Sequence, residues 1–363
     1  MIYREYGNTG KKVSVIGFGG MRFGKDEDYA VEVVRRASEL GINYFDTAHL
    51  YCDGRSEAIF GKAFKNMPRE FYTSTKTMLR IDPDADAVRR RIEDSLNKLG
   101  VEKINFFHMW CIMNLEQYTK IMAPGGPYEG AMKAKEEGLI DHLVFSTHCK
   151  GQDIRKIIED KVFEGVLLGY NVINHPFRQE GIKAALEHNV GVVTMNPLGG
   201  GLIPQHHEYF DFIKQYEGES VNQAALRFNG AQDGITVVLA GMGTLEEVEE
   251  NIKTLEHPLT FSEEKREEIK RKIAKDMDSL CTGCQYCISC PKKIQIHHYL
   301  QAYNLKVLKD EETMKKQVDW LKQAGRIKED DPIAADCIAC GKCEVVCTQK
   351  LPIIERLKEM GEL

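Results

Sequence analysis

Short apolar runs rich in β-branched and aromatic residues alternate with amphipathic stretches from Met1 to about Pro258. The runs have the length of strands, and the stretches between them repeat apolar positions every three or four residues, as helices do. Eight such pairs within ~250 residues are typical of an α/β fold of the (β/α)8 type, the TIM barrel. The predicted strands are Val13–Phe18, Tyr44–Phe45, Phe71–Ser74, Ile104–Met109, Leu143–Ser146, Val166–Leu168, Val192–Met195 and Thr236–Leu239. The predicted helices lie near 28–40, 56–65, 84–99, 128–137, 151–160, 178–189, 219–230 and 245–254.

An open, doubly wound sheet is the alternative interpretation of the same alternation. Such a sheet more often carries G-x-G-x-x-G after its first strand, where a helix begins. Here Gly17 to Gly20 reads Gly-Phe-Gly-Gly, but no third glycine follows at that spacing. The next residues, Met21 to Gly24, do not open a helix. The pattern therefore favours the closed barrel.

The pattern changes after the barrel segment. Residues 262–279 form a highly charged stretch, which predicts a linker helix. Apolar residues from His298 to Gln323 recur at spacings of three and four, which predicts a further helix. We therefore expect a barrel domain at 1–260 and, at 261–363, the linker helix with a small, mostly α-helical domain.

Composition and charge exclude several classes of protein. Of the 363 residues, 42% are hydrophobic and 29% are charged, which supplies ample apolar material for a large core. No apolar run approaches the ~18 residues that span a bilayer, and no hydrophobic signal segment opens the chain, so we expect a cytoplasmic protein without a membrane partner. The net charge is −6, whereas proteins that bind phosphate backbones are usually basic. Nucleic acid is therefore not an expected partner.

Eight of the 11 cysteines lie in two runs in the last quarter of the chain. Without an export signal, such runs point to metal rather than to disulfides. Structural zinc usually takes two C-x2-C pairs, whereas three thiolates at i, i+3 and i+6 with a fourth beyond them suit a [4Fe–4S] cluster. We therefore expect two [4Fe–4S] clusters in a ferredoxin-like domain, with structural zinc as the alternative. The candidate ligands are Cys281, Cys284, Cys287, Cys290, Cys337, Cys340, Cys343 and Cys347.

The spacing also predicts how the two clusters share these ligands. In two-cluster domains of this type, three cysteines of one run and the last cysteine of the other hold each cluster. There are two departures from the usual pattern. Only two residues separate Cys287 from Cys290, where the usual pattern has three, and Thr348 replaces the proline after the last cysteine. One predicted set is Cys281, Cys284, Cys287 and Cys347, and the other is Cys337, Cys340, Cys343 and Cys290.

Barrel chemistry is expected at the carboxyl ends of the strands. Four polar residues there form a chemical set: Asp46, Tyr51, Lys76 and His108. A tyrosine hydroxyl can protonate a developing alkoxide, but an ordinary pKa near ~10 is too high for the task. An ammonium beside it stabilises the tyrosinate, a carboxylate keeps the lysine charged, and an imidazole can orient the carbonyl. We therefore predict Tyr51 as general acid/base, Lys76 and Asp46 as the pair that tunes it, and His108 as a pocket residue.

With these residues in place, residues 1–258 resemble the aldo-keto reductase family, and the cysteine-rich addition resembles a recurrent iron–sulfur subgroup of that family. The resemblance implies an oxidoreductase that acts on a small carbonyl or alcohol substrate. The matching segments are Asp46–Tyr51 with Ser56, Glu57 and Gly61–Ala63, then Ser74–Lys76, Asn196–Leu202, and Gly241 with Glu250 and Asn251.

The chain departs from the family pattern at the catalytic histidine. The family's position for this residue falls on Trp110, and His108 lies two residues earlier on the same face of the strand. His108 can therefore point inward at a different depth, or it can be an ordinary buried histidine. Trp110 is then a candidate for shaping the carbonyl pocket.

The resemblance also implies a nicotinamide site, in which this chain is again unusual. Of the positions that hold the carboxamide and stack on the ring, only Ser146 keeps the family's residue type, because Leu167 and Met195 replace polar and aromatic residues. No Lys or Arg occurs from Phe228 through Ile252, where an adenosine 2′-phosphate would be held, so NADH is favoured over NADPH. The implied cofactor residues are Ser146, Asn196, Leu198, Gly199, Gly241, Gly243, Thr244, Glu250 and Asn251.

The number of electrons that each cofactor transfers at a time leaves further alternatives open. Iron–sulfur clusters move one electron at a time and a nicotinamide moves a hydride, so coupling them normally requires a carrier such as a flavin. FMN is therefore a second candidate cofactor, since the phosphate loops of barrels suit it as well. We expect an oxidoreductase with electron transfer through two clusters, and a ferredoxin-like carrier is a candidate partner. A redox-sensing protein on an inactive barrel is the remaining alternative.

Overall fold

The computed structural model describes residues 1–276 and 279–361. Contacts group the chain into two units, of which the first comprises Met1–Pro197 and Gln215–Phe261 and the second Leu198–Lys214 and Ser262–Leu363. The sequence pattern assigned 198–214 to the barrel, but this segment packs with the C-terminal residues. Among the described helices, none is long and apolar enough to cross a membrane.

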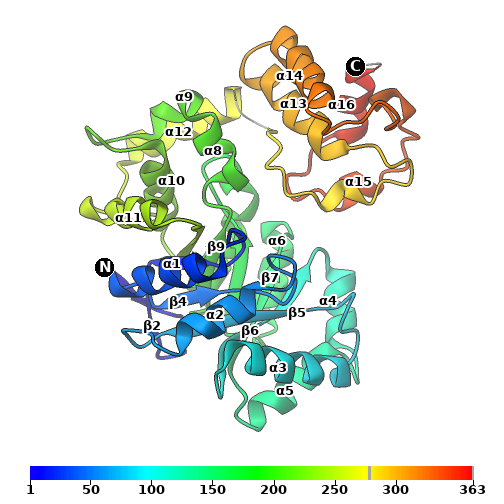
Figure 1. Cartoon of the computed structure of the whole chain (residues 1–363). Coiled ribbons are helices and arrows are strands. Elements are labelled where there is room, and N and C mark those ends of the chain that lie inside the picture. The colour runs from blue at the N-terminus through cyan, green and yellow to red at the C-terminus, as the bar shows by residue number, and fades with distance from the viewer. Residues whose placement is uncertain (277–278, 362–363) are drawn as a thin grey trace. The chain divides into compact units, whose positions relative to one another are not determined.

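The first unit is a closed barrel of eight parallel strands surrounded by helices (Figure 1). Neighbouring strands follow one another along the chain, and the last strand pairs with the first. Each predicted strand overlaps one strand of the barrel, so the predicted TIM barrel is confirmed. The strands are β3 (Ile16–Gly19), β4 (Tyr44–Asp46), β5 (Tyr72–Met78), β6 (Ile104–Ile112), β7 (Ile140–Thr147), β8 (Gly165–Gly169), β9 (Gly191–Met195) and β10 (Val237–Gly241).

A hairpin of β1 (Tyr3–Glu5) and β2 (Lys12–Ser14) precedes the barrel. The predicted strand Val13–Phe18 is therefore divided, because the Ser14 hydroxyl donates to the Ile16 carbonyl at 2.7 Å and interrupts the ladder. The hairpin places Tyr6 in the barrel interior, with its ring 4.3 Å from that of Phe106.

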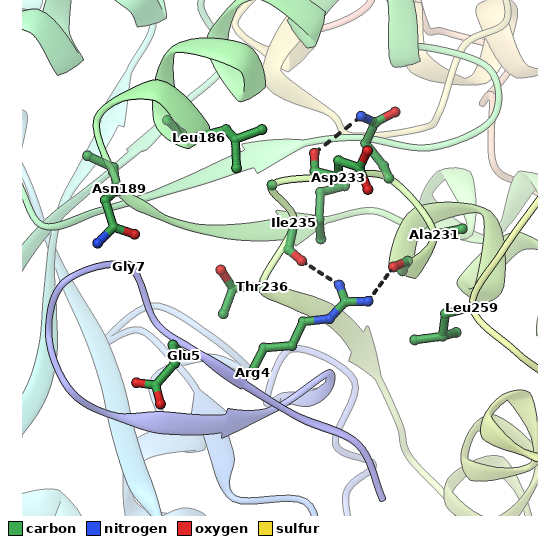
Figure 2. Close-up of a pocket in the computed structure, with 15 residues that line it drawn as sticks. Arg4, Glu5, Gly7, Leu186, Asn189, Ala231, Asp233, Ile235, Thr236 and Leu259 are labelled. Carbon is green, nitrogen blue, oxygen red and sulfur yellow. Dashed lines mark hydrogen bonds between the residues drawn. The ribbon is translucent and has the colours of Figure 1, made fainter.

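Arg4 fastens this hairpin to the barrel. Its guanidinium donates to the backbone carbonyls of Gly230 and Ile235 at 2.7 and 2.5 Å. These groups border a cavity of about 370 Å³ (Figure 2). Thr236 in its wall directly precedes β10, so the cavity lies at the amino ends of the strands, away from the predicted catalytic residues.

The helices around the barrel begin at side-chain caps that the sequence supplies. Asp26, Asp84, Asn114, Ser220 and Thr244 each accept a hydrogen bond from the backbone N–H three residues further on. The helices are α1 (Glu27–Glu39), α2 (Ser56–Phe64), α3 (Ala85–Leu99), α4 (Leu115–Met122), α5 (Pro127–Glu136), α6 (Gly151–Glu159), α7 (Gln179–Glu187), α10 (Val221–Gly230) and α11 (Leu245–Lys253).

The second unit is helical, as predicted, although one predicted helix is two. The stretch 298–323 breaks at Lys309, and the Asp310 carboxylate accepts from the Thr313 N–H to start a new helix. Of the predicted linker helix 262–279, residues 277–278 lie outside the described part of the chain. The helices are α8 (Leu202–Gln205), α9 (His207–Phe210), α12 (Glu263–Asp276), α13 (Ile296–Leu308), α14 (Glu311–Gln323), α15 (Lys342–Val345) and α16 (Ile353–Met360), and α13 and α14 lie side by side (Figure 1).

A buried ion pair joins the start of α10 to its last turn. The Arg227 guanidinium donates to both carboxylate oxygens of Glu219 at 2.7 Å, and both side chains are almost fully buried. The rings of Tyr216 and Phe261 cover the guanidinium at 4.7 and 4.5 Å. The pair is therefore shielded from water on both faces.

Glu219→Gln should lower the free energy of unfolding by about 3 to 5 kcal/mol, because it leaves the Arg227 charge buried and unpaired. Urea unfolding of the full chain, followed by circular dichroism, measures the loss. Glu39→Gln, which removes an exposed partner of Arg36, is the matched control and should change little. Equal midpoints for the two variants would contradict the role of the buried pair.

Candidate functional site

Strand register brings three of the four predicted catalytic residues together. Asp46 ends β4 and pairs in register with Ser74 on β5. Lys76 follows two residues later on the same face of β5 and pairs in register with His108 on β6. The side chains of Asp46, Lys76 and His108 are all buried in the barrel.

Lys76 and Asp46 form a buried ion pair. The Nζ atom lies 2.5 Å from Oδ1 of Asp46 and also donates to the Thr47 carbonyl at 2.6 Å. Burial lowers the pKa of Lys76, and the carboxylate of Asp46 opposes this shift by favouring the charged form. The ammonium also lies 5.2 Å from the centre of the Tyr51 ring. The Lys76 ammonium therefore bonds the Asp46 carboxylate and also lies close to the Tyr51 ring.

His108 lies beneath this pair rather than in an open pocket. The Ser74 hydroxyl donates to Asp46 Oδ2 at 2.7 Å, and Nε2 of His108 lies 2.9 Å from the same hydroxyl. Because the single Ser74 proton goes to Asp46, Nε2 of His108 must be the donor. The imidazole is 0% exposed, and burial together with the charge of Lys76 holds its pKa well below the usual value. His108 thus bonds, from a buried position, the Ser74 hydroxyl that donates to Asp46, and its predicted role beside a substrate stays a prediction.

Trp110 and His49 complete the surroundings of Tyr51. The half-buried Tyr51 meets the Trp110 ring edge to face, with ring centres 5.9 Å apart. His49 meets Trp110 in the same manner at 6.3 Å, and Nδ1 of His49 lies 3.2 Å from the Lys76 carbonyl. Sequence reasoning did not single out His49, although it lies inside the segment Asp46–Tyr51.

The residues expected to hold a nicotinamide ring are only partly suited to it. Ser146 is buried, and its hydroxyl has no hydrogen-bond partner among the described residues. Leu167 belongs to the apolar cluster around Tyr6. Asn196 adopts a positive φ of 57°, and its carbonyl accepts from the Asn171 amide at 2.9 Å. The site therefore offers few polar side chains to a carboxamide.

The turn before α11 has an acidic group where a phosphate was expected. Thr244 caps the helix, and the Glu247 carboxylate accepts from the Gly243 N–H at 2.6 Å. Arg22, in the loop after β3, packs on this turn, and a Cβ on Gly241 would lie 2.7 Å from the Arg22 side chain. Glycine at 241 therefore admits an arginine that sequence reasoning missed, since Arg22 lies far from this turn in the chain.

The remaining predicted cofactor residues are dispersed. Glu250 accepts from the Ser220 hydroxyl at 2.7 Å, and Asn251 is buried in α11. Leu198 and Gly199 belong to the second unit. Within that unit, a Cβ on Gly200 would clash with the Thr282 carbonyl, so glycine lets the loop after β9 rest against the first cysteine run.

The eight cysteines of the two runs form two neighbouring groups, and Cys287 of the first also interacts with Cys343 of the second. The thiols of Cys284, Cys287 and Cys347 act electrostatically on that of Cys281. The Cys281 and Cys347 sulfurs accept backbone N–H bonds from Gly283 and Leu351, each at 3.4 Å. Such bonds to sulfur are a usual feature of thiolate-held clusters.

The second set surrounds a small cavity. Its walls contain Cys290, Cys337, Cys340 and Cys343 together with apolar side chains such as Ile294 and Leu357. All 11 cysteines fall in the described residues, and none of them forms a disulfide. Four thiols around one hollow provide the donor set that a [4Fe–4S] cluster requires.

Comparison with known families agrees with this geometry. Residues 15–274 match the model of the aldo/keto reductase family, and residues 280–351 match that of a 4Fe-4S dicluster domain. The chain therefore belongs to the aldo/keto reductase family, and it is an oxidoreductase with a C-terminal dicluster domain. The family implies a small carbonyl substrate, and a dicluster domain implies two clusters.

Individual relatives cover most of the barrel. The chain is 30% identical to L-galactose dehydrogenase of Arabidopsis thaliana over 282 residues, which is 69% of this chain and 86% of the relative. It is 24% identical to D-threo-aldose 1-dehydrogenase of a Pseudomonas species over 242 residues, 57% of this chain and 73% of the relative. Among solved structures, a holo aldo-keto reductase of Bacillus halodurans superposes with a TM-score of 0.65 at 23% identity, covering 75% of this chain and 96% of that one.

The buried His108 makes stability depend on pH. Its pKa is depressed in the fold, so the unfolded chain binds the proton first as the pH falls below about 6.5. Stability attributable to His108 should be lost with falling pH by about 1.4 kcal/mol per unit, down to the depressed pKa. Urea unfolding at pH 5.5 to 8 should show a shallower acid slope for His108→Gln than for the parent, and parallel curves above pH 7. Parallel curves over the whole range would contradict the neutral, buried state.

Proposed function

We propose that the protein interconverts a small carbonyl compound and its alcohol at the barrel centre, with Tyr51 as general acid/base, and exchanges single electrons through two [4Fe–4S] clusters. The observation that carries the proposal is the position of Lys76, whose ammonium is bonded to Asp46 and lies 5.2 Å from the Tyr51 ring. This arrangement places a lysine that is paired with a carboxylate beside a phenol at the edge of the buried core.

In the reducing direction, Tyr51 donates its proton to the carbonyl oxygen as negative charge develops there. The ammonium of Lys76 stabilises the phenolate that remains, and Asp46 keeps the ammonium charged against the cost of burial. Ser74 and His108 hold Asp46 in place through their hydrogen bonds. Trp110 takes the family's histidine position and forms an apolar wall beside the Tyr51 ring. His108 is therefore proposed as a positioning residue.

A nicotinamide is the cofactor we propose for the barrel, and when bound it supplies the hydride for the carbonyl carbon. Ser146, Asn196 and the turn Gly241–Thr244 are the residues of the barrel unit that would hold it, together with Glu250 and Asn251. NADH is preferred over NADPH, since no basic residue lies between Phe228 and Ile252. Arg22, which rests on the Gly241 turn, offers a cation to the cofactor's diphosphate.

The two thiol sets support the predicted ligand assignment. We propose that Cys281, Cys284, Cys287 and Cys347 hold one cluster and that Cys290, Cys337, Cys340 and Cys343 hold the other. The N–H donors to Cys281 and Cys347 and the cavity lined by the second set support this division. A ferredoxin-like carrier in the cytoplasm is the proposed electron partner.

FMN is a second candidate cofactor, and the sparse polar contacts around Ser146 and Leu167 are the observation that favours it. A flavin accepts electrons singly or in pairs, so it would connect a two-electron substrate to the clusters. A yellow compound released from the purified protein by acid would favour FMN over a nicotinamide.

Tyr51→Phe should reduce carbonyl turnover by a factor of about 10² to 10⁴, because the proton donor is lost while the ring and its packing remain. Turnover is measured anaerobically with a panel of small aldehydes and ketones, and the visible absorbance of the clusters should be unchanged. Tyr3→Phe is the control, since its hydroxyl bonds the Gly41 carbonyl at the far end of the barrel. Full activity of Tyr51→Phe would disprove the assigned role.

Cys287→Ser should lower the iron and acid-labile sulfide of the reconstituted protein by about half, because one of the two clusters loses a ligand. Cys149→Ser, which changes a buried cysteine outside the two runs, should leave the iron content unaltered. Iron analysis under anaerobic conditions measures both. An undiminished iron content in Cys287→Ser would rule out the proposed ligand set.

A further inference from the structure

Arg356 on α16 is a buried cation that the proposed chemistry does not yet use. Its side chain is 5% exposed, and its guanidinium stacks 4.6 Å from the centre of the Tyr303 ring. Within the described part of the chain, its buried Nη1 atom has no hydrogen-bond partner. A buried guanidinium with an unsatisfied donor is costly, so it indicates a group that the donor would face.

The cysteines on which the charge of Arg356 acts belong to one set only. Its charge interacts with the thiols of Cys281 and Cys347. The nearby carboxylate of Glu359 is already bonded to the Tyr303 hydroxyl at 2.6 Å and to Lys306 at 2.8 Å. Arg356 is therefore a buried cation with one unpaired donor, and it acts electrostatically on Cys281 and Cys347 of this set.

The second set has surroundings of the opposite character. The carboxylate of Glu344 acts on the thiol of Cys343 and is held in place by the Ile354 N–H at 2.9 Å. The cavity walls around this set are otherwise apolar, with Ile294, Ile296 and Leu357 among them. One set therefore lies beside a buried cation and the other beside a carboxylate.

We infer that Arg356 is a redox-tuning residue, which raises the reduction potential of the cluster held by Cys281, Cys284, Cys287 and Cys347 above that of the other cluster. The inference rests on the proposed ligand sets. Reduction of a [4Fe–4S] cluster from the 2+ to the 1+ state adds one electron and makes or breaks no bond. The added negative charge is stabilised by a cation and by N–H donors to sulfur, and more strongly in a poorly screened interior. The electron comes from a low-potential, one-electron donor such as a reduced ferredoxin-like carrier.

The position of this cluster within the second unit indicates in which direction electrons would move between the two clusters. Thr282 adjoins Cys281, and Gly200 in the loop after β9 rests on the Thr282 carbonyl. Cys340 of the other set is exposed, and Ile338 beside it is 56% exposed. Electrons that enter at the exposed set therefore settle on the cluster beside Gly200 and Thr282 within the second unit.

The test is an anaerobic redox titration of the full, cluster-loaded chain with dithionite, followed by electron paramagnetic resonance. Arg356→Gln should shift the higher-potential couple to more negative values by at least tenfold in the ratio of reduced to oxidised cluster, or about 59 mV for a one-electron couple. The lower-potential couple should stay in place. Arg356→Lys keeps the charge and should stay close to the parent. Lys315→Gln removes an exposed charge on α14 that is paired with Glu311, and it should move neither couple.

Each result has a defined meaning. A shift of the higher couple in Arg356→Gln but not in Arg356→Lys supports the inference, and the same couple should remain in Cys340→Ser, which loses the other cluster. Unchanged couples, equal movement of both, or equal effects of Gln and Lys would overturn it. Failure of the proposed function looks different, because iron analysis of the parent would then not reach two clusters. A merely structural role of Arg356 would lower the iron content and would not shift one couple.

Discussion

The arrangement at the barrel centre depends on burying one charged pair, Lys76 and Asp46. A lysine inside a protein is tolerated only when its charge is compensated, and loss of either partner would leave the other charge exposed to a large desolvation cost. The pair constrains β4 and β5 to the register in which Asp46 lies beside Ser74, and it leaves the Lys76 ammonium directed toward Tyr51. The polar ladder of Ser74 and His108 then follows, since the second oxygen of Asp46 must also be satisfied. The ion pair of Lys76 and Asp46 thus serves both the packing of the barrel and the chemistry proposed for Tyr51.

Much of the barrel was predictable because its signals are local. Apolar runs, helix caps such as Asp84 and Ser220, and the succession of strands all follow from short-range rules. The proximity of Asp46, Lys76 and Tyr51 was predictable for a related reason, since the ends of parallel strands meet at one edge. The depth of His108 was not, because a strand pattern shows which face a residue takes and not how far along the barrel axis it lies. The contact of Arg22 with Gly241 could not be predicted either, because it depends on the closure of the barrel.

The cysteine-rich unit shows a different limit. Ligand spacing is a strong local signal, and the two runs predicted a 4Fe-4S dicluster domain, whereas the division of the thiols between two clusters stays a prediction. The surroundings of each set are not encoded in that spacing. Arg356 approaches Cys281 from a helix that begins after the last cysteine, and Glu344 lies within the second run. The prediction of a single helix over 298–323 was wrong because of one residue. The Asp310 side chain caps the start of a new helix instead of continuing the first one.

The segment Leu198–Lys214 makes the two units difficult to separate as modules. Because this segment leaves the barrel and packs with the C-terminal residues, the chain passes between the units three times, at Pro197–Leu198, at Lys214–Gln215 and at Phe261–Ser262. A chain ending at Phe261 would contain every barrel strand, yet the loop after β9 would lack the Thr282 carbonyl against which Gly200 rests. A cut at the domain boundary predicted from the sequence would therefore separate residues 198–214 from the unit with which they pack. Domain exchange between relatives with and without iron–sulfur units would have to transplant this loop together with the cysteines.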